Sequence, residues 1–205
     1  MLARVTLVWL ALLLTSASLP AQQFSLEAWH EGKVVLMTGD TVPGMIKYDL
    51  ENELVQVGGG GVIQTYGARK ILYFEFVDAL TEAYRVFYAL PFWIRPNYKA
   101  PLLFEVVYEG KMSLLSREYL VVESNTTYDI YNNPIYLGTT TRLVYDYYFL
   151  YQDGRIVGYR KKRKDLWKVI FKKHSSDMKK YIKENKLKAD RRADLVRMVA
   201  HYNSL

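Results

Sequence analysis

Apolar and polar residues alternate, or short apolar runs are broken by turn residues, from Lys33 to about Tyr159. Both patterns are typical of β-strands in a sandwich or a barrel. Tyr, Val, Phe and Ile, which favour the half-buried surface of a sheet, dominate these runs. The pattern predicts strands over residues 34–37, 45–48, 54–57, 62–66, 71–77, 84–90, 102–108, 112–115, 119–122, 142–151 and 155–159.

The residues between these runs predict antiparallel pairing. Asp153-Gly154 separates two aromatic-rich runs, and Asp-Gly is a strong hairpin signal because Gly tolerates the positive φ that such turns require. Glu109-Gly110 is a weaker second case. The run Gly58–Gly61 invites comparison with a phosphate-binding loop, but a strand pattern follows it instead of Lys-Ser or Lys-Thr on a helix, so we expect a hairpin loop. Residues 125–138 form the longest polar interruption, and we expect a mobile loop there.

After Tyr159 the apolar spacing becomes helical. Leu166, Val169 and Ile170 share one helical face, and Met178, Tyr181 and Ile182 repeat the spacing after a cap at Ser175 or Ser176. A last helix is expected from Asp190, with Leu195, Val196 and Val199 on one side. We expect these apolar stripes to dock on the β-region or on a partner and to leave the Lys and Arg side chains in water.

The N-terminus has the three parts of a secretory signal peptide. Arg4 gives one positive charge, an apolar stretch follows over residues 5–14, and small or polar residues lead to a cleavage site after Ala21. The alternative is an uncleaved membrane anchor, but a span needs about 20 apolar residues. The sequence therefore predicts three parts: a signal peptide over residues 1–21, a β-rich domain over 22–159 and a basic helical segment over 160–205.

Charge and cysteine content restrict the possible partners and the possible types of catalysis. From Tyr151 onward 17 basic residues face 6 acidic ones, a net charge of +11, whereas residues 22–150 carry 10 against 15, a net charge of −5. A tail of this sign attracts phosphate-rich or acidic surfaces, or docks on the acidic β-region itself. The chain has no Cys, so disulfides, thiol catalysis and Cys-ligated metals are excluded.

No catalytic, metal or cofactor motif stands out. His30, His174 and His201 lie far apart in sequence, and no Ser sits in a hydrolase motif. Two carboxylates could still converge in space to catalyse hydrolysis, as in glycosidases. The candidates for such a pair are Glu75, Glu105, Glu118, Glu123 and Asp146. We expect no cofactor and no metal.

The sharpest local feature is the basic segment Arg160, Lys161, Lys162, Arg163 and Lys164. Nucleic acid is disfavoured as its partner, because the predicted export removes the chain from nucleic acid and only Tyr159 and Trp167 supply flanking aromatics for stacking. Two interpretations remain: a solvated junction between strand and helix, and a contact with anionic lipid, lipopolysaccharide or an acidic envelope protein.

Parts of the sequence resemble exported proteins of Bacteroidota that have no assigned function. The resemblance rests on residues 39–49, 55–57 and 71–78 in the first half, and on 181–187, Asp194-Leu195 and 201–203 near the end. These stretches cover about a third of the chain and contain no functional motif. The resemblance implies a periplasmic or cell-surface location and a β-rich fold with terminal helices.

Together these observations predict an α+β protein, with an antiparallel β-sandwich or open barrel followed by two or three basic amphipathic helices. The favoured function is non-catalytic: an exported, envelope-associated interaction or structural protein whose basic tail, at residues 160–164, contacts an anionic surface or acidic partner. One alternative is a carrier of small hydrophobic ligands with a Tyr- and Phe-lined cavity in the β-domain. The other is a hydrolase with convergent carboxylates.

Overall fold

The computed structural model describes residues 25–159, 166–167 and 171–205. The predicted signal peptide and the basic segment 160–164 therefore lie outside the described residues. Ten antiparallel strands form one open sheet, and helices follow near the C-terminus, so the predicted α+β class is confirmed. The elements are η1 (Ser25–Glu27), β1 (His30–Leu36), β2 (Thr41–Asp49), β3 (Leu54–Gly59), β4 (Val62–Gly67), β5 (Ile71–Val77), β6 (Tyr84–Arg95), β7 (Tyr98–Tyr108), β8 (Met112–Tyr128), β9 (Pro134–Tyr151), β10 (Ile156–Tyr159), α3 (Ser175–Glu184) and α4 (Arg192–Ser204).

The strand order is β10-β9-β8-β7-β6-β5-β1-β2-β3-β4. Strands β5 to β10 follow each other as a meander, and β1 inserts between β5 and β2. The predicted turns hold: Gly154 between β9 and β10 has φ +78°, and Gly60 and Gly61 between β3 and β4 have φ +57° and +79°. These left-handed values explain why glycine occupies the turns.

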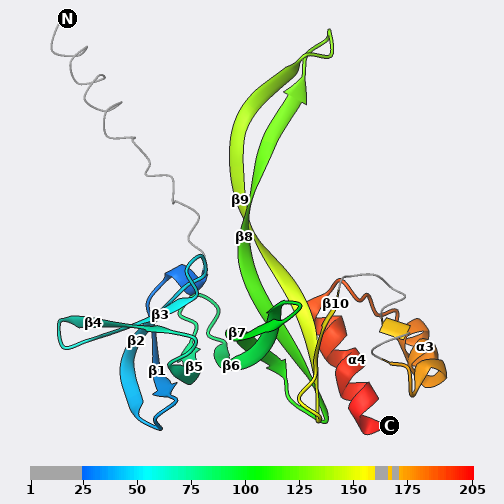
Figure 1. The fold of residues 1–205 in the computed structure, drawn as a ribbon. Coiled ribbons are helices and arrows are strands. Elements are labelled where there is room, and N and C mark those ends of the chain that lie inside the picture. Colours follow the sequence, from blue (N-terminus) through cyan, green and yellow to red (C-terminus); the bar gives the residue numbers. More distant parts are fainter. Residues whose placement is uncertain (1–24, 160–165, 168–170) are drawn as a thin grey trace, which may run out of the picture.

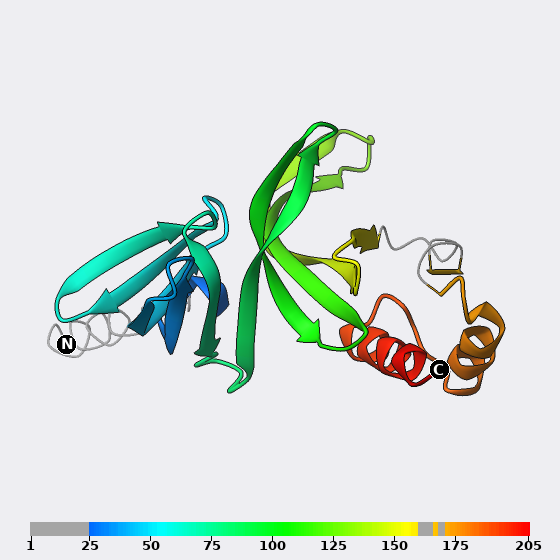
Figure 2. The same cartoon turned by 60° about the horizontal axis from the view of Figure 1, so that its bottom comes forward.

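Two hydrophobic clusters share the sheet. The first lies among β1, β2, β3, β5 and β6, where Phe74, Phe76 and Phe87 stack and Ile46 is fully buried. The second lies between the β8–β10 end of the sheet and the C-terminal helices (Figure 2). Its buried members are Met112, Leu114, Tyr147, Phe149, Tyr159, Leu166, Phe171, Met178, Leu187, Leu195, Met198 and Val199. The helices thus dock on the sheet through their apolar faces, as the periodicity predicts.

The helix starts differ from the expected caps. Helix α3 begins at Ser175, where His174 is the N-cap residue, and α4 begins at Arg192 after Arg191, with no side-chain cap bond at either start. Asp190 therefore does not cap α4. Asn203 fixes the far end of α4 instead, because its side chain accepts a bond from Met112 N (2.9 Å) and donates one to Met112 O (2.8 Å).

The expectation of a mobile loop over residues 125–138 is wrong. Strands β8 and β9 continue through this region as a two-stranded arm that projects from the sheet (Figure 1). Strand β7 pairs with β8 as far as Ser116, and β10 pairs with β9 only from Tyr147 onward. Between the pairs Tyr119–Val144 and Tyr128–Pro134, a distance of roughly 30 Å, the two strands pair only with each other. We call residues 119–144 the arm.

Polar β-formers explain why a polar stretch still forms strands. Thr126 and Thr127 in β8 and Thr139, Thr140 and Thr141 in β9 carry branched side chains, which suit extended backbone. The turn at the end, residues 129–133, contains Asn132-Asn133, and Pro134 begins β9 directly after it. Residues 125–138, the longest polar interruption in the sequence, therefore form the end of a hairpin whose strands face water on both sides.

Deleting the arm tests its independence from the rest of the fold. Residues 121–142 are replaced by Asn-Gly, so that Leu120 and Leu143, which already pair, flank a two-residue hairpin turn. Because an isolated two-stranded ribbon is at best marginally stable, we expect the free energy of unfolding in urea to fall by no more than about 1 kcal/mol. A loss of about 2–5 kcal/mol, as for a truncated core residue, would show instead that the arm is part of the core.

Candidate functional site

A buried ionic network forms where β6, β7, β8 and α4 meet. Arg85 donates from Nε to Glu105 Oε1 at 3.0 Å and from Nη2 to Glu118 Oε1. Arg192 donates to both oxygens of Glu105, at 2.9 and 2.6 Å, and Arg85 also lies 3.7 Å from Asp78. The side chains of Arg85, Asp78, Glu105 and Glu118 are each at most 9% exposed. The network therefore holds Arg85 and three carboxyl groups in a desolvated place, and Arg192 reaches Glu105 from the surface, with its side chain 40% exposed.

The strand register explains why these charges meet. Phe87, Glu105, Ser116 and Tyr147 are aligned across four neighbouring strands and therefore share one face of the sheet. Arg85 and Glu118 lie two residues along their strands from this row, on the same face. The guanidinium of Arg85 also lies over the rings of Phe76 and Phe87, at 5.9 and 5.1 Å from their centroids. The network thus lies at the border between the two hydrophobic clusters.

The two glutamates titrate in opposite directions. Burial alone would raise the pKa of Glu105, but the bonds from Arg192 and the charge of Arg85 outweigh it and hold the pKa below its ordinary value. Burial raises the pKa of Glu118 above its ordinary value, and Arg85 offsets only part of this effect. Glu118 Oε2 and Ser116 Oγ are buried without a hydrogen-bond partner among the described residues. Glu118 is therefore the weakly satisfied member of the network.

The network also reaches the N-terminal end of the described chain. Asp78 accepts hydrogen bonds from the Ser25 hydroxyl and from the Leu80 and Thr81 N–H groups. His30 is buried beside it, accepts from Ala79 N–H at Nδ1 (2.9 Å) and bonds Ser25 O through Nε2 (2.5 Å). Asp78 and His30 thus fasten η1 to the turn between β5 and β6.

The other predicted carboxylates lie apart from this network. Glu75 pairs with Lys33 at 2.9 Å, Glu123 pairs with Arg142 on the arm, and Asp146 lies 3.5 Å from the Tyr119 hydroxyl. Of the five candidates, the structure therefore brings only Glu105 and Glu118 together. Both share one guanidinium, an arrangement that neutralises carboxylates and keeps them from solvent.

The three histidines do not form a site. His30 is buried in the N-terminal cluster, His201 stacks on Tyr181 with ring centroids 3.7 Å apart, and His174 meets the edge of Tyr202. Among the described residues, no group of three or more His, Asp or Glu side chains could hold a metal ion. No described helix is long and apolar enough to cross a bilayer.

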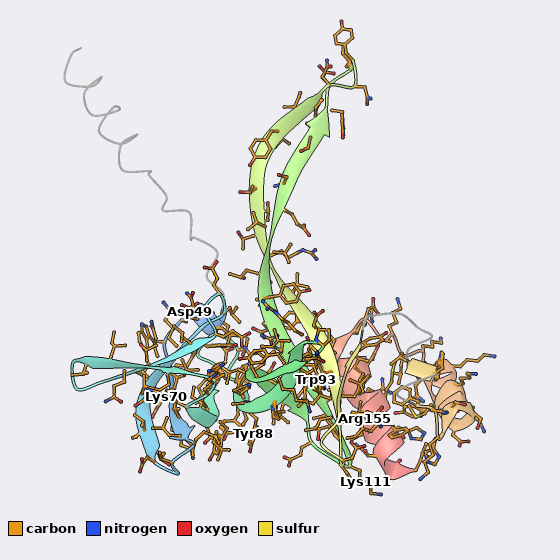
Figure 3. All side chains as sticks on the ribbon, in the orientation of Figure 1. Asp49, Lys70, Tyr88, Trp93, Lys111 and Arg155 are labelled. Carbon is orange, nitrogen blue, oxygen red and sulfur yellow. The ribbon has the colours of Figure 1, made fainter. Side chains whose placement is uncertain are left out.

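A cleft of about 390 Å³ opens between the C-terminal helical region and the β7–β8 and β9–β10 turns. Lys111, Asp153, Lys173, His174 and Asn203 contribute polar groups to its wall. Lys111 and Arg155 mark this end of the sheet in Figure 3. The wall of the cleft thus combines apolar and polar side chains, and its lysines outnumber its single acidic side chain.

The C-terminal helical region presents a set of exposed lysines that we call the lysine face. Its members are Lys172, Lys173, Lys179, Lys180, Lys183, Lys186 and Lys188. No carboxylate of the described residues lies within 4 Å of the side-chain ammonium group of any of them, although the Lys188 backbone N–H donates to Asp194 at 2.9 Å. Lys179 Nζ lies 5.7 Å from the Trp167 ring centroid. The predicted segment Arg160–Lys164 precedes this face in the chain but lies outside the described residues.

Sequence reasoning missed Arg85 and Arg192 as network members, although a signal exists. Arg85 occupies an inward position beside Phe87, and Glu105 and Glu118 lie on inward-facing positions of the next strands. A charge at an apolar position on three successive strands indicates a buried ion pair. The outer part of the arm, residues 123–141, was missed as strand because its strands lack a continuous apolar face, whereas the strands over 119–122 and 142–151 were predicted.

No known protein family, no curated protein and no solved structure matches the chain.

Removing the Arg85 guanidinium tests the network. We expect Arg85→Met to lower the free energy of unfolding in urea by about 3–5 kcal/mol, because Glu105 and Glu118 lose their shared cation while still buried. Arg155→Met is the matched control, since Arg155 is mostly exposed, forms its ion pair with Asp153 of the same turn and stands over the Tyr151 ring. Equal, small effects of both substitutions would contradict a network that stabilises the fold.

Glu118→Gln tests the sign of the titration. Because the folded-state pKa of Glu118 is raised from 4.5, its contribution to stability is fully present below pH 4.5 and is lost as the pH rises through the folded-state value. Gln cannot ionise, so the variant does not lose stability in this way as the pH rises. We therefore expect its free energy of unfolding, relative to the unsubstituted protein, to increase between pH 4 and pH 8 in parallel urea titrations. A relative stability that stays flat or falls over this range would show that Glu118 is ionised normally in the fold.

Proposed function

We propose that this chain is a non-catalytic, exported protein of the cell envelope that binds an anionic surface through its C-terminal basic region. The observation that carries the proposal is the lysine face. Seven lysines lie on the water side of a helical region whose apolar side is committed to the core through Phe171, Met178 and Leu187. Packing of the apolar side therefore leaves these lysines exposed to water.

Charge arithmetic supports an anionic partner. Residues 171–205 carry ten Lys and Arg against four Asp and Glu, and the five cations at 160–164 precede them in the sequence. Each cation near an anionic membrane surface contributes about 1 kcal/mol of attraction at most, so a cluster is needed for useful affinity. Phosphate groups of anionic lipids or lipopolysaccharide, and carboxylates of an acidic envelope protein, share the required chemistry.

The state of the carboxylates supports a non-catalytic function. A pair of glutamates that acts on substrate must be reachable, with one group free to donate a proton and the other to accept one or attack. Glu105 and Glu118 are instead bound by Arg85 and covered, and Arg192 closes over Glu105. This geometry favours a stabilising ion network over hydrolysis.

The carrier of hydrophobic ligands remains a prediction with less support. It would need an apolar cavity lined by Tyr and Phe within the sheet region. The cleft of about 390 Å³ lies outside the sheet, beside the helical region, and Lys111, Lys173 and His174 line part of it.

Sedimentation with lipid vesicles tests the proposal. The chain from residue 22, which keeps every described residue, is mixed with vesicles of phosphatidylglycerol and phosphatidylcholine at low and high salt. We expect binding to anionic vesicles at low salt that weakens at least tenfold at 1 M salt, because the Debye length falls to about 3 Å. Changing residues 160–164 to Ser, or Lys180 and Lys183 to Gln, should weaken it further.

Lys70 and Arg95, both exposed, supply a control of equal charge when changed to Gln. Lys70 lies among the N-terminal strands, at the other end of the molecule from the helices (Figure 3). If the control loses as much affinity as Lys180→Gln with Lys183→Gln, net charge and not the lysine face drives binding. Absence of any salt-sensitive binding to anionic vesicles refutes a lipid surface and leaves acidic proteins for the same assay.

A further inference from the structure

The tip of the arm, residues 128–137, exposes large apolar and aromatic side chains. Their exposed fractions are 62% for Tyr128, 90% for Ile130, 79% for Tyr131, 44% for Ile135, 62% for Tyr136 and 66% for Leu137. Single exposed apolar residues are ordinary, but a cluster of six on one projecting turn indicates a contact site. The tip is also the part of the arm farthest from the sheet (Figure 1).

These side chains surround the tip. Tyr136 is paired with Thr126 and so shares a face with Tyr128, whereas Ile135 is paired with Thr127 on the opposite face. Leu137 is the extra residue of a bulge, because Asn125 pairs with Gly138 and Thr126 pairs with Tyr136. Ile130 and Tyr131 lie on the turn. A flat protein surface would cover one of these faces and leave the other exposed.

The tip is nearly uncharged. Between Ser124 and Thr141 the only ionisable acid or base is Asp129, apart from the tyrosines. Its carboxylate accepts bonds from Tyr131 N–H (2.8 Å), Asn133 N–H (2.8 Å) and the Asn133 side chain (3.0 Å). These bonds within the turn satisfy the carboxylate. The tip therefore neither attracts nor repels a neutral surface.

We propose that the tip of the arm inserts into the headgroup region of a lipid bilayer. Tyr is enriched where one end of a side chain is apolar and the other is wet, as at the membrane interface, and three tyrosines accompany Ile and Leu here. A fluid layer encloses a projection from all sides, which fits apolar side chains on both faces and on the turn. The tip carries only the Asp129 carboxylate, which is bonded within the turn, and this low charge suits a zwitterionic headgroup layer.

The depth of insertion is limited by the backbone. Each strand of the arm pairs on one side only, so outward N–H and C=O groups line both edges. Such groups cannot enter the hydrocarbon core without a partner, but the hydrated headgroup region satisfies them. The charged pair Glu123 and Arg142 lies farther down the arm, nearer the sheet. The tip is thus built for shallow insertion.

A second copy of the chain is the competing occupant. The tip comprises ten residues, whereas a stable protein interface buries about 800 Å² on each partner, contributed by some 20–30 residues. The exposed apolar groups are divided between two faces and a turn, so one partner arm would cover only some of them. The lipid surface accounts for all six.

Insertion of the tip does not require the lysine face. Insertion of the tip is driven by burial of apolar groups and is independent of salt, whereas the lysine face acts by screened charge. Salt and lipid composition therefore separate the two sites in one assay.

A dye at the tip tests the proposal directly. The chain contains no Cys, so Ile130→Cys in the chain from residue 22 gives a single site for an environment-sensitive fluorophore. With phosphatidylcholine vesicles we expect a blue shift that saturates with lipid and is the same at low and high salt. Lys70→Cys, labelled in the same way on the exposed surface of the N-terminal strands, should show no shift.

A variant that lacks the apolar side chains of the tip gives a second, independent test. Ile130→Ser, Tyr131→Ser and Leu137→Ser together should weaken sedimentation with phosphatidylcholine vesicles at least tenfold. The thermal midpoint should stay unchanged, because the three side chains are exposed and lie beyond the part of β8 and β9 that pairs with β7 and β10. The variant with Ser at residues 160–164 should bind these neutral vesicles as well as the unsubstituted chain.

Two results would overturn the proposal. One is an absence of any dye shift with neutral lipid while salt-sensitive binding to anionic vesicles persists, which would leave the lysine face as the membrane contact. The other is a dye shift that grows with protein concentration in the absence of lipid, which would identify a second copy as the occupant. Failure of the lysine-face test alone would not affect the dye response.

Discussion

The buried network around Arg85 holds the molecule together at the border of its two hydrophobic clusters. An open sheet of ten strands has no closed core, so the N-terminal and C-terminal clusters could in principle move as separate bodies. Arg85 links them, because it stands over Phe76 and Phe87 of one cluster and binds Glu105, which also accepts from Arg192 on α4, a helix of the other cluster. Buried ion pairs add little net stability, but losing one member is costly, so they enforce one arrangement.

The network also positions both proposed contact surfaces. Glu118 immediately precedes the arm, so its bond to Arg85 anchors the root from which the tip projects. Arg192 begins α4, and α4 and α3 carry or border the lysine face. Two surfaces that use different forces, apolar insertion and screened charge, are thereby held on one frame. Such a combination resembles the two-signal logic of peripheral membrane binding, in which neither contact alone gives stable attachment.

Local patterning predicted most of the fold. Alternation from Lys33 to Tyr159 located the strands, Asp153-Gly154 marked a hairpin, and the stripe through Leu195 and Val199 gave the buried side of the last helix. The outer part of the arm, residues 123–141, was missed because Thr-rich strands that face water on both sides carry no apolar period. Convergence of Glu105 with Glu118 was foreseen only as one option among five carboxylates, since the register that aligns them depends on pairing across distant strands.

Hydrogen exchange on the Glu105→Gln protein tests the central claim, that this network couples the two halves of the molecule. Glu105 accepts from both Arg85 and Arg192, so its neutralisation should loosen both partners. The account predicts faster amide exchange in β6 and in α4 together, although about a hundred residues separate them in the chain. Faster exchange confined to β7 and its immediate neighbours would contradict it, and would mean that packing alone joins the helices to the sheet.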